Sequence, residues 1–98
     1  MYKRQSLDSE INNLIIYKKA LYNADNAQES DLLNMLNPLI NSKSVWKSHS
    51  LYLMAEYFYA NNQKQKSKEF IQKLANLENA SQKIKTEALK RLRVDFGE

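Results

Sequence analysis

Apolar residues recur every three or four positions in five segments of this chain, and polar residues fill the positions between them. This period is that of an α-helix with one buried face. The pattern predicts helices over about residues 6–23, 26–41, 46–60, 64–77 and 81–96, joined by short polar turns. The fold class that follows is all-α. It consists of antiparallel helical hairpins over about 6–41 and 45–77, with the last helix capping the second hairpin.

Each predicted helix carries an apolar stripe that is expected to face the core. The inward positions are Ile11, Leu14, Ile15 and Leu21, with Tyr17, Ala20 and Tyr22 beside them; Leu32, Leu33, Leu36, Leu39 and Ile40; Leu51, Met54, Ala55 and Phe58; Phe70, Ile71, Leu74 and Leu77; and Ile84, Ala88, Leu89 and Leu92.

Local signals mark the helix ends. Asn26 followed by Glu29 has the spacing of a capping box, which predicts a helix start at Asn26. Pro38 removes one backbone hydrogen bond and predicts a kink or an early helix end. Asn62 follows Asn61 in a turn, and asparagine tolerates the left-handed conformation that such turns require. Gly97 is a normal helix stop.

Composition restricts the class of protein. Ninety-eight residues, 43% of them hydrophobic, are sufficient for a single domain with one core spanning residues 1–98. No run of 18 or more apolar residues is present, so the segment itself is not expected to contact a membrane. The absence of Cys excludes disulfides and does not choose a compartment. The net charge of +4 makes nucleic-acid binding an alternative, although the basic residues are spread along the chain.

The sequence contains no recognisable catalytic or metal-binding motif. His49 is the only histidine, and no other ligand lies at metal-binding spacing from it. A single glycine also excludes the glycine-rich phosphate-binding loops. We therefore predict a protein that is not an enzyme and has no cofactor and no metal.

The second hairpin resembles one degenerate tetratricopeptide repeat. Ala55 occupies the small position of its first helix, Phe58 the aromatic position one turn later, and Ser67 the small position of the second helix, with Ile71 following. Asn62 and Asn79 stand where a turn glycine and a closing proline are common. Such repeats bury their apolar faces by stacking, and they act as scaffolds that hold other proteins.

A second stripe lies beside the core stripe of the predicted helix 46–60. His49, Tyr52, Glu56 and Tyr59 are spaced i, i+3, i+7 and i+10, so they share one face. In tetratricopeptide arrays this face lines the concave groove, and the resemblance implies that these four residues bind a protein partner. The alternative is ordinary packing, with the tyrosine rings under the first helix and their hydroxyls at the edge.

A wider resemblance covers residues 11–97. The positions of Pro38, Trp46, Ala88 and Leu92 are similar to those of a bacterial family, the ancillary subunit of the SecYEG translocon and its tetratricopeptide-like relatives. The resemblance implies a fragment of a longer membrane-anchored protein on the periplasmic side of the inner membrane, in contact with the translocon or with chaperones. Without the resemblance, a cytoplasmic location is equally consistent with the composition.

Two further predictions concern the first hairpin. Trp46 is expected to pack onto Leu51 or back onto the helix 26–41. If an upstream neighbour is missing, the outer face of the first helix should carry apolar residues, with Ile16 and Tyr17 as candidates. Weak self-association through this helix would follow.

The sequence leaves three hypotheses open. The first is a non-catalytic protein-interaction scaffold with an unidentified protein partner. The second is a small basic helical protein that binds nucleic acid through a basic face around Lys85, Lys90 and Arg93. The third is a purely structural cap for an upstream helical array.

Overall fold

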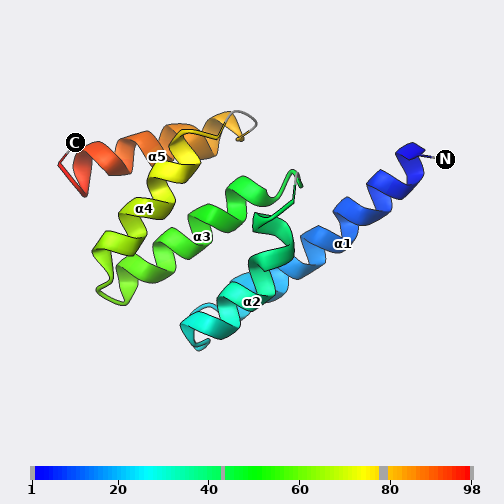
Figure 1. Cartoon of the computed structure of the whole chain (residues 1–98), viewed down its shortest axis with the longest axis horizontal. Helices are drawn as coiled ribbons and strands as arrows, with labels where there is room; N and C mark the ends of the chain where they lie inside the picture. The colour runs from blue at the N-terminus through cyan, green and yellow to red at the C-terminus, as the bar shows by residue number, and fades with distance from the viewer. Residues whose placement is uncertain (1, 43, 78–79, 98) are drawn as a thin grey trace. The chain divides into compact units, whose positions relative to one another are not determined.

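A computed structural model describes residues 2–42, 44–77 and 80–97, with side chains from Ser9 onward. The regular elements of this part of the chain are five α-helices, which confirms the predicted all-α class (Figure 1). They are α1 (Tyr2–Asn23), α2 (Glu29–Ile40), α3 (Lys47–Ala60), α4 (Lys64–Ala75) and α5 (Gln82–Val94). None of these helices is both long enough and apolar enough to cross a membrane.

The chain divides into two compact units between Lys47 and Ser48, at the start of α3. The first unit comprises Met1–Lys47 and contains α1 and α2, and the second comprises Ser48–Glu98 and contains α3, α4 and α5. The division falls near the start of the second hairpin that the sequence predicts over 45–77.

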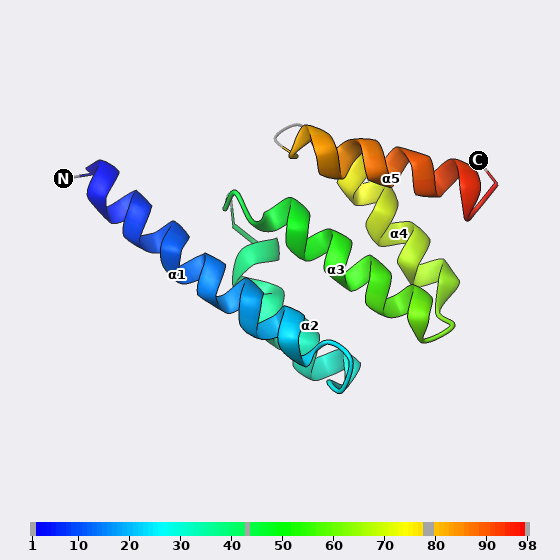
Figure 2. The same cartoon turned by 180° about the vertical axis from the view of Figure 1, so that it is seen from behind.

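The first unit is a hairpin of unequal helices. The helices α1 and α2 run antiparallel, and the N-terminal half of α1 extends beyond α2 in both views (Figures 1 and 2). The predicted inward face of α2 is largely correct, because Leu32, Leu36 and Leu39 are completely buried. The much longer α1 has part of its surface without a partner in this unit.

The predicted inward face of α1 is wrong for most of its residues. Ile11, Ile15 and Leu21 are about half exposed and Tyr22 is 87% exposed, whereas the small Ala20 is completely buried. Apolar residues occur on nearly every side of α1, so the period alone does not choose the buried face. A face with alanine at its centre lets another helix approach closely. The outer face is apolar, as predicted, but the half-buried Ile16 and Tyr17 are not its exposed members.

A single carboxylate fastens α1 to the segment before α3. Glu10 accepts hydrogen bonds from the Ser44 hydroxyl at 2.7 Å and from the Val45 backbone N–H at 2.8 Å. The Ser44 hydroxyl oxygen in turn accepts the Trp46 N–H at 3.1 Å. This chain of hydrogen bonds closes the first unit, and we call it the Glu10 clasp.

Trp46 packs on α1 through a ring stack that the sequence did not predict. Its ring stacks on that of Tyr17 with centroids 5.8 Å apart and an interplanar angle of 18°. The clasp fixes the backbone next to Trp46, so the indole lies within reach of α1. Burial raises the pKa of the Tyr17 hydroxyl, which stays protonated at neutral pH.

The ends of α2 differ in part from the expected signals. Asn26 does not cap this helix: its N–H closes the turn onto the Asn23 carbonyl at 3.1 Å, and Gln28 is the N-cap residue. Glu29 is the first helical residue, so the three-residue spacing is that of a turn and not of a capping box. Pro38 is accommodated near the end of α2, which finishes two residues later at Ile40.

The second unit is built on a close contact between α3 and α4. The hydroxyl of the buried Ser67 donates to the Ala55 carbonyl at 2.7 Å, so the two predicted small residues do meet. Phe58 packs against Phe70 with ring centroids 5.2 Å apart. The predicted core positions Leu51, Met54, Ala55, Phe58, Ile71 and Leu74 are all buried.

Asn62 adopts the predicted left-handed conformation, with φ of 63°. The N–H of Gln63 donates to the Phe58 carbonyl at 2.8 Å, and that of Asn62 donates to Tyr59 at 3.2 Å. These two bonds form a Schellman motif, which satisfies carbonyls left open at the end of α3. The turn between α3 and α4 is therefore set by local backbone chemistry.

The fifth helix packs on α4 and completes the second unit (Figure 1). Ala88 is buried and Leu92 is nearly so, as predicted, but Leu89 is 53% exposed and was wrongly placed inward. Gly97 follows the helix with φ of +72°, in agreement with a helix stop. Asn79, the position of the common proline in the repeat, lies outside the described residues.

Candidate functional site

Three of the four predicted stripe residues gather around one arginine of the second unit. Arg91 of α5 lies with its guanidinium carbon 5.8 Å from the centre of the Tyr52 ring and 5.2 Å from that of Tyr59. It also pairs with the carboxylate of Glu56. A cation over the faces of two aromatic rings gains electrostatic attraction from both. The stripe is thus covered in part by the chain's own last helix.

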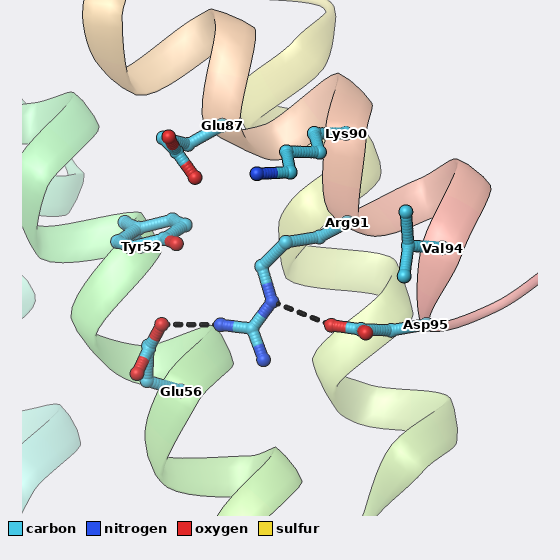
Figure 3. Close-up of a pocket in the computed structure, with 7 residues that line it drawn as sticks. All are labelled: Tyr52, Glu56, Glu87, Lys90, Arg91, Val94 and Asp95. Carbon is cyan, nitrogen blue, oxygen red and sulfur yellow. Dashed lines mark hydrogen bonds and ion pairs between the residues drawn. The ribbon is translucent and has the colours of Figure 1, made fainter.

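Arg91 is held from a second side by α5 itself. Its Nε donates to Asp95 at 2.9 Å, and Asp95 lies one turn further along (Figure 3). Burial alone would lower the pKa of Arg91, but hydrogen bonds to Asp95 and Tyr52 and the charge of Glu56 outweigh it, and the pKa is raised. Arg91 is therefore a fixed cation between two carboxylates.

The half-buried Tyr52 ring packs against the guanidinium of Arg91. Burial raises its pKa, and the hydrogen bond with Arg91 opposes the rise only in part. The phenol therefore stays neutral at physiological pH and can donate or accept a hydrogen bond.

A shallow hollow of about 290 Å³ opens beside Arg91 (Figure 3). It is lined by Tyr52, Glu56, Glu87, Lys90, Arg91, Val94 and Asp95. The Tyr52 ring and the Val94 side chain supply apolar surface. Glu87 and Lys90 supply opposite charges, and neither forms an ion pair or side-chain hydrogen bond with another described residue. The hollow can therefore offer both a donor and an acceptor to an incoming chain.

Tyr59 belongs to the packing of the second unit more than to the hollow. Phe96 meets its ring edge-on at 5.9 Å, and the Lys64 ammonium lies 5.7 Å from its centre. Tyr59 is not among the residues that line the hollow. Its ring packs against the guanidinium of Arg91.

His49 does not line the hollow, although it shares the stripe with Tyr52. Its imidazole is half-buried, and burial lowers its pKa, which favours the neutral form. Over the part of the chain that the structure describes, no three His, Cys, Asp or Glu residues are grouped so that they could hold a metal ion.

Sequence reasoning missed the contribution of α5 to this site. The sequence indicated only a basic face around Lys85, Lys90 and Arg93 on the last helix, and it did not predict that Arg91 turns onto α3. One signal was available. Glu87, Arg91 and Asp95 follow one another at intervals of four residues, so they form a row of alternating charges along one face of the helix.

A comparison of the chain with models of protein families, with curated proteins and with solved structures finds no match. The resemblance to tetratricopeptide repeats and to the translocon subunit therefore remains a prediction from the sequence.

Proposed function

We propose that the chain is a non-catalytic protein-interaction module of tetratricopeptide-like type, and that it binds a protein segment in the hollow between α3 and α5. The observation that carries the proposal is the combination of Tyr52 with the charged pair Glu87 and Lys90 in one hollow. Tyrosine gives contact area at low entropic cost and is enriched at the centres of protein interfaces. The charged pair is available to orient a peptide.

Packing within the second unit supports the repeat-like part of the proposal. A small residue on α3 meets a small residue on α4, and α5 covers the next face, as a capping helix does in a stacked array. Compared with the prediction from sequence, the anchor is reduced to Tyr52. Tyr59 is occupied by Phe96, Lys64 and Arg91.

Affinity capture from a bacterial cell-envelope extract tests the proposal, and the translocon ancillary family supplies the reason for this extract. The wild type is compared with Tyr52→Ala and with Tyr57→Ala. Tyr57 is a half-buried tyrosine on the same helix that does not line the hollow, so it controls for lost packing. Folding of each variant is checked by circular dichroism.

The expected result is at least about fivefold weaker capture by Tyr52→Ala, since a hot-spot side chain contributes more than about 1 kcal/mol. Tyr57→Ala should capture as the wild type does. Equal capture by a folded Tyr52→Ala variant would contradict a binding site in the hollow.

A further inference from the structure

The outer face of α5 carries a row of cations next to the hollow. Lys83, Lys90 and Arg93 are exposed and lie seven and ten residues apart, so they share one face of the helix over about 15 Å. We call these three residues the α5 basic stripe. Residues 48–98 contain nine Lys and Arg against six Asp and Glu, which leaves this unit positive.

Several basic residues elsewhere in the second unit have partners within the fold. On α4, Lys64, Lys66 and Lys73 lie over the rings of Tyr59, Phe58 and Phe70 at 5.7, 5.5 and 5.0 Å. Cations in such positions contribute to packing through the aromatic face.

The α5 basic stripe has no such role in the described structure. No described carboxylate or aromatic ring pairs with Lys83, Lys90 or Arg93. Lys83 even lies in the first turn of α5, where the helix dipole disfavours a cation. Arg93 lies in the last turn, where the dipole favours a cation. Lys83 and Lys90 have no such compensation among the described residues, so the stripe is open to an external anion.

The surroundings of the stripe distinguish between classes of anion. The exposed aliphatic side chains Leu89 and Val94 flank it, at 53% and 66% exposure. On the side of the hollow it is bordered by the carboxylates of Glu87 and Asp95. A nucleic acid carries a phosphate at every nucleotide, so some of its charges would lie opposite these carboxylates, whereas a peptide can keep uncharged residues there. A peptide can place its acidic residues on the cations and its apolar residues on Leu89 and Val94.

An anionic membrane is a poorer match. A helix that lies on a lipid surface needs a broad apolar face turned toward the lipid. In α5 the apolar residues Ala88 and Leu92 are packed inside the unit, Ile84 is half-buried, and Leu89 and Val94 are the exposed large apolar side chains.

We infer that the α5 basic stripe binds an acidic peptide segment, whose carboxylates pair with Lys83, Lys90 and Arg93 while a neighbouring apolar residue enters the hollow. This inference rests on the proposed function and names the chemistry of the partner. The contacts lie at an exposed rim, so they set the salt dependence and the rate of association more than the final affinity.

Fluorescence anisotropy with a defined probe tests the inference on the full chain. The probe is a labelled 12-residue peptide in which Glu alternates with Ser and one Leu lies at the centre. A peptide with Gln in place of Glu, oligothymidine of the same charge, and phosphatidylglycerol vesicles are the comparison ligands. The stripe variant is K83Q/K90Q/R93Q, and K64Q/K66Q/K73Q removes the same charge from α4.

We expect the Glu peptide to bind more weakly as salt rises and the Gln peptide not to bind. The stripe variant should lose about tenfold in affinity because it removes three exposed ion pairs, whereas the α4 variant should lose less than about twofold. Equal losses in both variants, no binding of the Glu peptide, or tighter stripe-dependent binding of oligothymidine or vesicles would each overturn the inference. The double variant K83Q/R93Q keeps Lys90 in the hollow. Loss of envelope capture in Tyr52→Ala with no effect of K83Q/R93Q on either capture or peptide binding would overturn the inference while leaving the proposed function intact.

Discussion

The two units of this chain use their polar and aromatic residues in opposite ways. In the first, one carboxylate, Glu10, and one ring stack, Tyr17 on Trp46, hold α1 to the segment before α3. In the second, a buried small-residue contact joins α3 and α4, and cations lie over the aromatic rings. The first unit exposes apolar surface on α1, while the second exposes positive charge on α5.

The difference follows from how much partner surface each helix has. Two helices of 22 and 12 residues cannot cover each other, so apolar residues of α1 remain exposed in the first unit. Three helices of 14, 12 and 13 residues match in length, so α3 is extensively buried. Matched helix lengths therefore let the second unit bury most of its apolar residues, and its exposed large apolar side chains are Leu89 and Val94 of α5.

The largest effect is expected at the centre of the second unit. Ala55→Leu should overpack the contact with Ser67 and lower the free energy of unfolding by about 1–3 kcal/mol. Ala60→Leu, at an exposed position on the same helix, is the control and should change stability by less than about 0.5 kcal/mol. Urea unfolding followed by circular dichroism measures both. An unchanged midpoint for Ala55→Leu would show that α3 and α4 are not closely packed.

A smaller effect is expected at the cation between α3 and α5. Arg91→Gln should lower the free energy of unfolding by about 1 kcal/mol, because it removes two ring contacts and two ion pairs that water screens in part. Arg93→Gln removes the same charge from an exposed position without a described partner. If the two variants unfold at the same urea concentration, Arg91 does not join α5 to α3.

The Glu10 clasp should make the first unit sensitive to acid. Hydrogen bonds from Asn13, Val45 and Ser44, in that order of effect, lower the pKa of Glu10 below its ordinary 4.5. A carboxylate whose pKa is lowered by folding stabilises the fold at any pH above its pKa in the unfolded chain. This stabilisation is lost as the pH falls through its pKa in the folded chain.

Glu10→Gln should therefore weaken the first unit at pH 7 by less than about 1 kcal/mol, and the difference from wild type should shrink below pH 4.5. Fluorescence of Trp46, the only tryptophan of the chain, reports on this unit during unfolding. If the difference in stability between Glu10→Gln and the wild type is the same at pH 7 and below pH 4.5, the charge of Glu10 does not stabilise the clasp.

The smallest effect concerns the apolar outer face of α1. We expect weak self-association of the chain at high concentration, and Ile15→Lys should reduce it. Leu89→Lys, at a similarly exposed aliphatic position on α5, should leave it unchanged. Sedimentation velocity over a concentration series measures the effect. A wild type that stays strictly monomeric would leave the exposed face of α1 without a role in assembly.

Much of the second unit was readable from residue patterns. The stripe Leu51, Met54 and Phe58 has helical spacing and is buried as expected, although Leu53, outside the stripe, is buried as well. Asn62 predicted the left-handed turn correctly, because few residues other than glycine and asparagine adopt that conformation. These features depend on contacts within a few residues of the chain, where the rules of local conformation apply.

The sequence by itself determined five helices, the turn at Asn62, the meeting of Ala55 with Ser67, and a common face for Tyr52, Glu56 and Tyr59. Tertiary structure alone decided which side of α1 is buried, because apolar residues on nearly all sides give the period no preference. It also decided that Arg91 enters the stripe while Arg93 remains outside. Both arginines are flexible cations two positions apart. The placement of α3 beside α5 makes Arg91 a half-buried partner of Tyr52 and leaves Arg93 exposed.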